Sequence, residues 1–410
     1  MIIPAAKRTE NIREYYFSLK LKEIAALNQK RTACGEKPVV NLGIGSPNGM
    51  PPEKAIQALA SQTTRPDVHA YQSYTGIPEL RQAMAGWYRR YYDTDLDPNR
   101  EIQPLTGSKE GILLISLAFL NEGDKVLVPD PGYPTYTSAS RLAGAEIIPY
   151  DLIESQGWQP DFEVLEKMDL EGVRIMWTNY PNMPTGGRAT EELYSKLVRF
   201  GKKHKILICN DNPYSFILND HPLSILQTDG ARECALELNS LSKAHNMSGW
   251  RIGMVAAAPE IISTILKVKS QMDSGMFRPL QLAAVKALEE GPQWYEALNG
   301  EYRKRKRHAG EFYDTIGVGY DKDSNGMFLW GKASEDNPMA YGALPDGSVP
   351  EAKDPGKSLG ERISDYLLYR HGIFITPGFI FGKNGRNYVR ISLCSNAEVY
   401  EELARGLKQE

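Results

Sequence analysis

The chain has 410 residues, of which 41% are hydrophobic and 24% are charged, and its formal net charge is -3. This length exceeds one ordinary core, so we expect two or more domains. The balanced charge excludes the basic surface of a nucleic-acid-binding protein, and no apolar run approaches the ~20 residues needed to cross a membrane.

The first residues predict an arm rather than a targeting signal. Lys7 and Arg8 are followed by neither an apolar stretch nor a cleavage pattern, so we expect no signal peptide. We expect the residues before Leu42 to pack on a smaller domain or on a partner. The cysteines, which have no paired spacing, are Cys34, Cys209, Cys234 and Cys394. They predict reduced thiols in a cytoplasmic protein rather than disulfides or a zinc site.

The first glycine-rich segment, Gly43-Ile44-Gly45, does not predict nucleotide binding. Pro47 follows at once, a third glycine is missing, and Pro51-Pro52 delays any helix. Further along, residues 71–81 predict a loop that enters a helix at Pro78.

Strand and helix patterns then alternate through the middle of the chain. Apolar strand-like runs and amphipathic helical runs follow one another at 126–128, 135–142, 147–150, 173–177, 191–204 and 206–209. This succession predicts a mostly parallel, doubly wound sheet. Ligands of such sheets bind at the carboxyl ends of the strands, in the loops that follow.

Two motifs occupy such loops before residue 140. Residues 106–111 precede an apolar helix at 112–120, and free N–H groups at a helix start bind phosphate, although Ser108 as a plain N-cap explains the motif too. Residues 131–136 place Tyr133 at another strand-to-helix turn. Its ring either packs in the core or stacks on a cofactor ring.

A third motif, Asp211-Asn212-Pro213-Tyr214, follows the strand at 206–209. These residue types favour a simple turn. Alternatively, a buried Asp211 carboxylate holds a proton on the pyridine nitrogen of a cofactor, while Tyr214 donates to the ring oxygen.

The strongest local signal is Ser240-Leu241-Ser242-Lys243, followed by Arg251 between Gly249 and Gly253. Most lysines are solvated surface amines. This lysine follows an apolar run, and strand alternation points Ser240 and Ser242 the same way. A buried lysine with a depressed pKa attacks a carbonyl, and serine hydroxyls with an arginine hold a phosphate.

The polarity changes after residue 291. A basic helical pattern at 294–315, strand-like runs at 373–375 and 388–391, and a last helix from Ala397 predict a smaller α+β domain. We therefore expect an arm and part of the small domain at 1–49, a large cofactor-binding domain at 50–290 and the small domain at 291–410. The Gly-, Pro- and Asp-rich segment 332–357 is expected to be a loop insertion.

Arg390 alternates with apolar neighbours in residues 388–392, so we expect its side chain to face inward. A buried guanidinium needs an anion, and its planar fork suits a carboxylate. A substrate carboxylate and a structural salt bridge both remain open for this residue. For Arg278, a distal substrate carboxylate and an interface salt bridge are open in the same way.

Together these motifs resemble the class I and II aminotransferases, which have the aspartate aminotransferase fold (fold type I of the pyridoxal-phosphate enzymes). The match runs in family order from about Asn41 to Ser392, and residues 107–111 and 273–277 look most like the branch with LL-diaminopimelate and alanine aminotransferases. The resemblance implies an α/β large domain with a mostly parallel seven-stranded sheet sandwiched by helices, plus a smaller α+β domain. It implies pyridoxal 5'-phosphate as cofactor.

The resemblance also implies roles for individual residues. Lys243 matches the Schiff-base lysine, Asp211 the partner of the pyridine nitrogen, and Tyr214 the donor to the ring oxygen. Tyr133 occupies the position that stacks on the ring, and Arg390 that of the substrate-carboxylate arginine. The remaining positions that match the family's cofactor-phosphate site are Gly107, Ser108, Lys109, Ser240, Ser242 and Arg251.

Three further positions complete the match. Gly45 lies at the glycine that contacts the substrate carboxylate. Tyr71 matches a tyrosine that reaches the phosphate of the neighbouring subunit, which implies a homodimer. The family motif Asn-Pro-Thr-Gly departs here, because Met183 replaces the asparagine that donates to the ring oxygen and cannot donate itself. Asn182 lies one residue away, and we do not expect it to compensate.

The implied activity is ping-pong transfer of an amino group between an α-amino acid and a 2-oxo acid, with Lys243 as general base and acid. Two alternatives stay open. A β-eliminating carbon–sulfur lyase on the same scaffold would need no second 2-oxo acid. A ligand-sensing domain of a transcription regulator would need a DNA-binding extension, and the arm before Leu42 is short and not notably basic.

Overall fold

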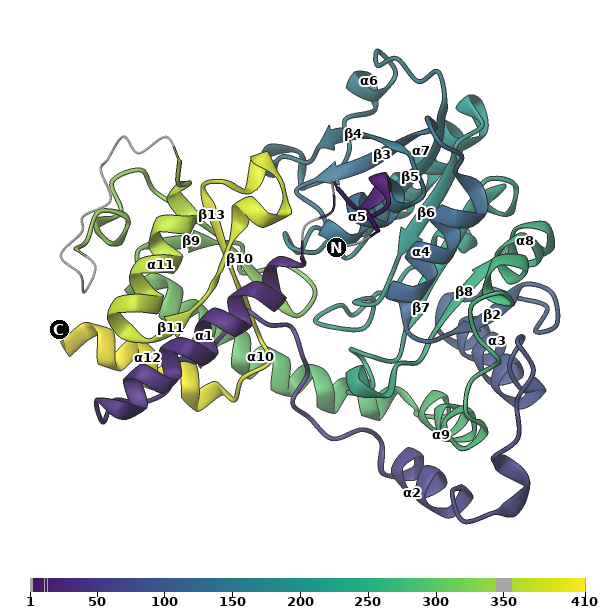
Figure 1. Ribbon diagram of the computed structural model, residues 1–410, viewed down its shortest axis with the longest axis horizontal. Helices are drawn as coiled ribbons and strands as arrows, with labels where there is room; N and C mark the ends of the chain where they lie inside the picture. The colour runs from purple at the N-terminus through teal and green to yellow at the C-terminus, as the bar shows by residue number, and fades with distance from the viewer. Residues whose placement is uncertain (1–2, 11, 13, 344–355, 410) are drawn as a thin grey trace.

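The computed structural model describes residues 3–10, 12, 14–343 and 356–409. Figure 1 shows a larger lobe built on one broad sheet and a smaller lobe beside it, joined by the long helix α10 (Pro292–Thr315). No helix among the residues placed by the structure is long and apolar enough to cross a membrane.

A seven-stranded sheet forms the centre of the larger lobe, in the order β2-β8-β7-β6-β5-β3-β4. Strands β3 to β7 run parallel, and β8 runs antiparallel to both of its neighbours. The strands are β2 (Ile102–Leu105), β3 (Lys125–Asp130), β4 (Glu146–Asp151), β5 (Val173–Asn179), β6 (Leu207–Asp211), β7 (Ala235–Ser240) and β8 (Gly253–Ala257). The mostly parallel seven-stranded sheet is therefore confirmed.

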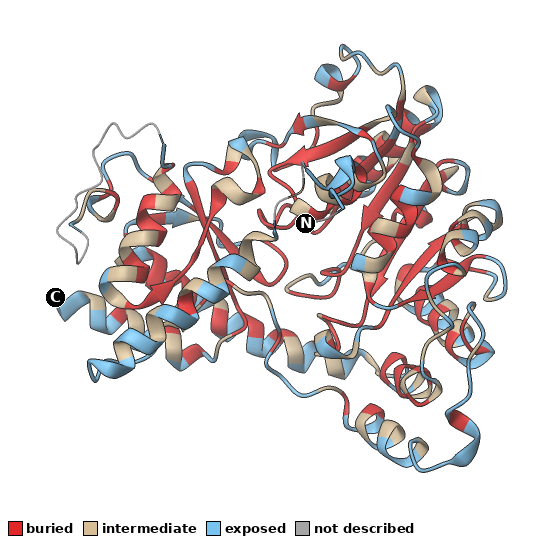
Figure 2. Cartoon of the chain, viewed as in Figure 1, coloured by how far each residue is buried: buried red, intermediate tan, exposed pale blue. Residues whose placement is uncertain are grey.

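Strand alternation divides the apolar residues of this sheet between two cores. Val126 and Val128 face a cluster covered by α4 (Ser108–Phe119), α5 (Pro134–Leu142) and α8 (Pro259–Lys269). Leu127, between them, belongs to the cluster on the other face, together with residues of α3, α7 and α9. Because both faces are covered, the central strands read as continuous apolar runs. Figure 2 shows these strands buried along their length.

The helices on the second face are α3 (Pro78–Tyr92), α7 (Glu191–His204) and α9 (Arg278–Leu288), with α2 (Glu53–Gln62) outside α9. The start of α7 is fixed by Thr190, whose side chain accepts a hydrogen bond from the Leu193 N–H at 3.0 Å. One short helix, α6 (Phe162–Leu165), lies at the rim of the sheet.

The smaller lobe contains an antiparallel sheet in the order β12-β13-β10-β9. Its elements are β9 (Val318–Tyr320), β10 (Phe328–Ala333), β12 (Thr376–Pro377), β13 (Tyr388–Ser392), α11 (Leu359–His371) and α12 (Ala397–Gln409). The N-terminal arm joins this lobe through β1 (Val40–Asn41), which pairs in parallel with β11 (Ile373–Phe374). Helix α1 (Tyr16–Ala33) adds Ile24 to a buried cluster with Leu368 and Phe374. We therefore propose domain boundaries near residues 50 and 290, with the arm as part of the smaller domain.

Several expected boundaries differ from the observed ones. Helix α4 begins at Ser108, not at residue 112, so Gly107 is its N-cap and Ser108 is already helical. Helix α10 begins at Pro292, because proline is favoured in a first helical turn. The expected loop insertion 332–357 begins inside β10, and its residues 344–355 lie outside the described part of the chain.

Candidate active site

A pocket of about 440 Å³ lies where the carboxyl ends of the central strands face the arm and the smaller lobe. Strands β5, β6 and β7 deliver Asn179, Asp211 and Ser240 to it, and Lys243 follows just after β7. Parallel strands place their carboxyl ends at one edge of a sheet, so residues far apart in sequence converge there.

Lys243 is half-buried and lines this pocket. Its Nζ donates a hydrogen bond to the carbonyl oxygen of Gly45 at 2.7 Å. Burial lowers the pKa of this amine to about 8, with Cys394 and Asp211 opposing the shift and Arg390 and Arg251 adding to it. A sizeable fraction of the amine is therefore neutral near pH 7 to 8, as a nucleophile or a general base requires.

Asp211, the last residue of β6, is buried. The Tyr136 hydroxyl donates to its Oδ2 at 2.9 Å, whereas Oδ1 has no hydrogen-bond partner among the described residues. Burial raises the pKa of this carboxyl to about 7, opposed by Tyr136 and increased by Glu237. A buried carboxylate oxygen without a donor fits a protonated ring nitrogen in the pocket.

Tyr136 fixes the orientation of Asp211. It is fully buried on α5, and its ring stacks on Trp177 with centroids 5.0 Å apart and an interplanar angle of 6°. The sequence motif 131–136 contains Tyr136, but only Tyr133 was predicted to have a role there. Tyr133 is the N-cap of α5 and Tyr136 lies in its first turn, so the second tyrosine of the same short motif was the available signal.

A cup of hydroxyl and cationic groups forms one end of the pocket. Ser240 Oγ donates to Ser242 Oγ at 2.8 Å, and Arg251 Nη1 lies 3.4 Å from Ser242 Oγ. Gly107 has φ +78° and lies against the Arg251 guanidinium so closely that a β-carbon would not fit. Ser108, the first residue of α4, lines the same pocket. This arrangement suits a phosphate.

Lys109 lines the pocket from the first turn of α4. Its side chain is exposed, and its ammonium lies 4.5 Å from the centre of the Tyr15 ring. The cation is therefore held at the wall of the pocket next to the arm.

Tyr133 and Tyr214 line the space between the cup and the arm. Tyr133 meets Tyr136 edge-on at 5.6 Å, and Tyr214 meets Phe328 edge-on at 5.8 Å. Burial holds the pKa of Tyr214 well above its usual range, although the Arg390 charge opposes this. Both positions agree with rings that contact a cofactor.

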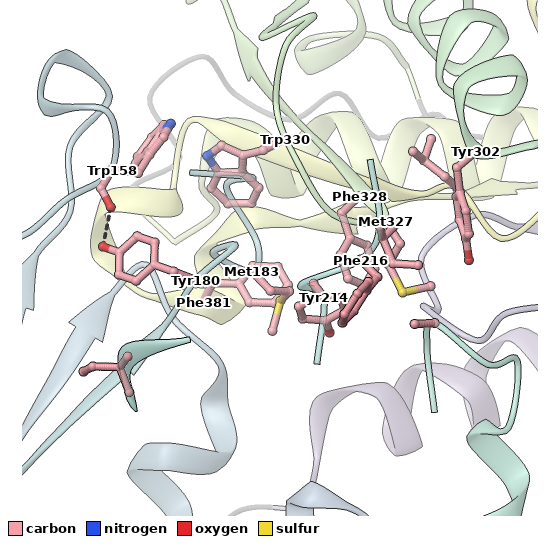
Figure 3. Close-up of a cluster of buried hydrophobic side chains, with 14 of the residues drawn as sticks. Trp158, Tyr180, Met183, Tyr214, Phe216, Tyr302, Met327, Phe328, Trp330 and Phe381 are labelled. Atoms are coloured by element: carbon pink, nitrogen blue, oxygen red, sulfur yellow. Dashed lines mark hydrogen bonds between the residues drawn. The ribbon is translucent and has the colours of Figure 1, made fainter. Parts of the chain in front are cut away.

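Arg390 forms the other end of the pocket, from β13. Its Nη2 donates to the Gly43 carbonyl at 2.6 Å, and Nη1 donates to Met183 Sδ at 3.2 Å. The rings of Phe328, Phe381 and Phe17 lie 4.0, 4.8 and 5.5 Å from its guanidinium carbon. Part of this aromatic cluster is seen in Figure 3.

This environment leaves Arg390 ready for an anion. Its Nε is buried without a hydrogen-bond partner in the described residues, and burial lowers its pKa to about 10. A guanidinium surrounded by rings and carbonyls gains most from a carboxylate that enters the pocket. Gly45 lets the Phe328 ring come close to the backbone beside Arg390, because a β-carbon at this position would collide with that ring.

Met183, which replaces the asparagine of the family motif, contacts Arg390 and lines the pocket. Asn182 does not line the pocket, and its side-chain oxygen accepts from Thr185 Oγ1 at 2.7 Å. Asn179 does line it, but its Oδ1 accepts from the Met183 N–H and its Nδ2 donates to the Asp211 carbonyl. Among these matched positions, Tyr214 remains the donor available for a ring oxygen.

The N-terminal arm contributes to the pocket, which the sequence did not predict. Tyr15, Phe17, Ser18 and Leu21 line the pocket mouth. The run of three aromatic residues at 15–17 was the available signal, because such a run in a polar arm predicts a buried contact. Tyr71, in contrast, is 91% exposed and does not line the pocket of its own chain.

Comparisons with known proteins agree with this geometry. A family model described as aminotransferase class I and II matches residues 37–407. LL-diaminopimelate aminotransferase from Natranaerobius thermophilus is 37% identical over 391 residues, 95% of each chain. The enzyme of that name from Aquifex aeolicus is 37% identical over 403 residues, 96% of this chain and 99% of the relative. Substrate-bound BacF from Bacillus subtillis superposes with a TM-score of 0.87 at 31% identity, covering 100% of this chain and 98% of that one.

Proposed function

The chain belongs to the class I and II aminotransferases and is a pyridoxal-phosphate-dependent enzyme of that family, and from this premise we propose which residues carry out its reaction. The enzyme transfers an amino group between an α-amino acid and a 2-oxo acid. The relatives reported above favour neither a carbon–sulfur lyase nor the sensing domain of a regulator.

The pocket residues fit the cofactor on two observations: Asp211 Oδ1 is buried without a donor among the described residues, and the Arg251 guanidinium lies so close to Gly107 that no β-carbon fits between them. Lys243 would bond the cofactor, Asp211 would keep its ring nitrogen protonated, Tyr133 would contact the ring and Tyr214 would donate to the ring oxygen. The residues that would hold the phosphate are Gly107, Ser108, Lys109, Ser240, Ser242 and Arg251. When bound, the cofactor supplies an electron-poor ring that takes up the electrons released at the substrate α-carbon.

The chain's own residues then bind and move protons. Arg390 binds the substrate α-carboxylate with its fork, beside Gly45. Lys243 takes the proton from the substrate α-carbon as general base and later returns one as general acid. Its pKa of about 8 suits both roles near neutral pH. Tyr15 and Phe17 of the arm shield the Arg390 end of the pocket from water.

The amino donor is proposed from the relatives. Those reported above are named LL-diaminopimelate aminotransferase, so LL-diaminopimelate is the first donor to assay, followed by alanine, aspartate and glutamate. Each donor is paired with 2-oxoglutarate or pyruvate as acceptor. The proposal predicts turnover only when both an amino donor and a 2-oxo acid are present. Release of a 2-oxo acid and ammonia without an acceptor would instead indicate elimination.

A homodimer with shared sites is the proposed assembly. Tyr71 is almost fully exposed, and Met50, Tyr74 and Phe277 are exposed in part, so the larger lobe offers apolar surface to a second copy. In the dimer, Tyr71 reaches the cofactor phosphate of the partner. The cysteines are all free thiols, which agrees with the proposed cytoplasmic location.

Subunit mixing tests the shared site. A hybrid of a Tyr71→Ala subunit and a Lys243→Ala subunit contains one site in which both residues are intact. Two inactive parents should therefore regain activity on mixing. A monomer in sedimentation, or proven hybrids without recovered activity, would contradict the shared site.

A further inference from the structure

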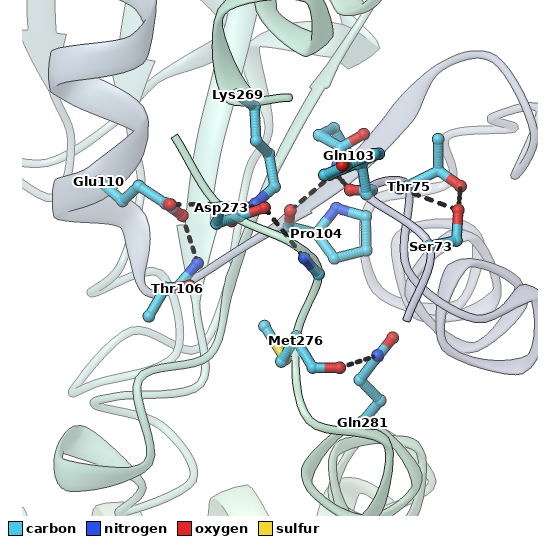
Figure 4. A network of polar contacts seen from close by, with 12 residues as sticks. Ser73, Thr75, Gln103, Pro104, Thr106, Glu110, Lys269, Asp273, Met276 and Gln281 are labelled. Carbon is cyan, nitrogen blue, oxygen red and sulfur yellow. Dashed lines mark hydrogen bonds and ion pairs between the residues drawn. The ribbon is translucent and has the colours of Figure 1, made fainter. Parts of the chain in front are cut away.

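A buried ion cluster lies outside the pocket, next to the loop that enters α4. Lys269, at the end of α8, is 3% exposed. Its ammonium forms an ion pair with Asp273 and lies 3.9 Å from the Glu110 carboxylate (Figure 4). A lysine is rarely buried to this degree without such partners, and breaking a buried pair is costly.

One side of the cluster holds the loop proposed to bind phosphate. The Glu110 carboxylate accepts a hydrogen bond from the Thr106 N–H, across the turn at Gly107 and Ser108. Lys269 fixes Glu110, and Glu110 fixes the shape of this turn. Lys269 itself is not among the residues that line the pocket.

The other side of the cluster holds the loop 273–277. Asp273 Oδ1 accepts from the Gly275 N–H at 3.1 Å. Gly275 has φ +86°, and a β-carbon there would lie 2.5 Å from the Gln72 carbonyl oxygen. Because Gln72 follows Tyr71 directly, the loop 273–277 packs on the segment that carries Tyr71.

Gln281 ties the same two segments together. Its Oε1 accepts from the Ile77 N–H at 2.8 Å, and its Nε2 donates to the Met276 carbonyl. Gln103 adds a further connection by donating to the Tyr74 carbonyl at 2.8 Å. An unbroken series of polar and packing contacts therefore leads from Thr106 through Lys269 to the segment 71–77 (Figure 4).

We propose that Lys269 is a positioning residue that couples the phosphate loop of its own site to Tyr71, which the same chain presents to the partner's site. The inference rests on the proposed homodimer. Cofactor phosphate that orders residues 106–109 in one site then favours the Tyr71 position required by the other. The two sites of a dimer are thereby coupled in cofactor binding.

The first test compares Lys269→Met with Lys267→Met, which removes an exposed lysine of the same helix. Lys269→Met should weaken binding of pyridoxal phosphate by roughly tenfold or more, the scale of a lost charged hydrogen bond. Binding of pyridoxal, which lacks the phosphate, should change little. Lys267→Met should leave both unchanged. Equal losses for both ligands would indicate general damage to the fold and overturn the proposal.

Because Lys269→Met leaves two carboxylates without their cation, a neutral variant keeps the test valid if that protein unfolds. The triple variant Glu110→Gln, Lys269→Met and Asp273→Asn has no buried charge left in the cluster. It should show the same selective loss of phosphate-dependent binding. Wild-type affinity in a folded triple variant would contradict a positioning role.

Hybrid dimers test the coupling across the interface. A Lys243→Ala/Lys269→Met subunit is paired with a wild-type subunit, whose own Lys243 and phosphate loop are intact. The amount of cofactor that borohydride fixes to the wild-type chain is measured by mass spectrometry against cofactor concentration. Half-saturation should need several-fold more cofactor than in a control hybrid that carries Lys243→Ala/Lys267→Met.

The outcomes separate this inference from the proposed dimer. Equal half-saturation in the two hybrids would overturn the coupling, while recovered activity in the Tyr71→Ala and Lys243→Ala hybrid would still support the dimer. If the enzyme sediments as a monomer, both the proposed dimer and the coupling between its sites are contradicted.

Discussion

The two ends of the pocket are built differently. At the cofactor end, Asp211, Ser240 and Lys243 come from the carboxyl ends of adjacent strands, and polar groups pair with one another. At the substrate end, Arg390 comes from the smaller sheet and is surrounded by aromatic rings from the arm and from β10. The first end is thus determined by one sheet, whereas the second depends on how the arm and the smaller lobe pack against it.

This difference separates the groups that carry out the reaction from the groups that bind the amino-acid substrate. The carboxyl ends of the strands hold Asp211, Ser240 and Lys243 in a fixed geometry, as a catalytic site requires. Rings and an arm that cover Arg390 can be rearranged without disturbing Lys243 or Asp211. Substitutions at the cofactor end should therefore remove the reaction, and substitutions at the substrate end should mainly weaken binding of the amino acid.

The largest effect is expected for Lys243→Ala. Removing the amine that moves the α-carbon proton should lower kcat by at least ~10²–10⁴-fold. The matched control is Lys267→Ala on α8, which removes an exposed amine. Steady-state assays with the best donor measure both. Activity within a few-fold of wild type for Lys243→Ala would place the base elsewhere.

The second prediction concerns pH and the cofactor end. Burial raises the pKa of Asp211 from 3.8 to about 7, so the native protein without cofactor holds a proton that the unfolded chain releases. Its free energy of unfolding should fall as pH rises from about 4 to about 7, by up to roughly 4 kcal/mol from this group. Glu237, with its pKa also raised to about 7 by burial, adds to the same trend.

Thermal unfolding between pH 5 and 8 measures this effect. Asp211→Asn should make the profile of the cofactor-free enzyme less steep, because the amide cannot ionise and only Glu237 then contributes. Added cofactor should flatten the wild-type profile as well, since its protonated nitrogen favours the charged carboxylate. A cofactor-free wild type whose stability rises steadily over this range would contradict the assignment.

The third prediction moves to the substrate end. Arg390→Ala should retain the cofactor but lose at least ~2–3 kcal/mol of transition-state binding, as for a charged hydrogen-bonded contact. Arg386→Ala, which removes an exposed arginine beside the same strand, is the control. The kcat/KM for the amino donor is the measurement. An unchanged value would contradict the role of Arg390 in binding the carboxylate, and loss of bound cofactor would show that the two ends are not separable in this way.

The smallest effect is expected for Met183→Asn. Met183 lies between the two ends of the pocket. A restored amide donor would stabilise the anionic form of the ring oxygen. It should thereby lower the pKa of the nitrogen that joins Lys243 to the cofactor by up to roughly one to two units. Met183→Leu, which removes the thioether contact with Arg390 without adding a donor, separates the two roles. Superimposable absorbance titrations of wild type and Met183→Asn would mean that another group already serves the oxygen.

The sequence predicted the cofactor end better than the substrate end. Lys243 and Asp211 could be found because each follows a continuous apolar strand, and a parallel sheet brings such positions together. The contact between Arg390 and Phe17 could not be found, because strand alternation predicts that Arg390 faces inward but not which segment covers it. The start of α4 was placed late because Ser108 and Lys109 lack the apolar periodicity of residues 112–119.

The chemical reduction of the bound cofactor tests the central claim most directly. Wild-type enzyme loaded with pyridoxal phosphate is treated with borohydride, digested and analysed by mass spectrometry. The account predicts one modified residue, Lys243, and no modified peptide from the Lys243→Ala protein. Reduced cofactor on a different lysine of the wild-type enzyme would contradict the assignment on which both ends of the pocket depend.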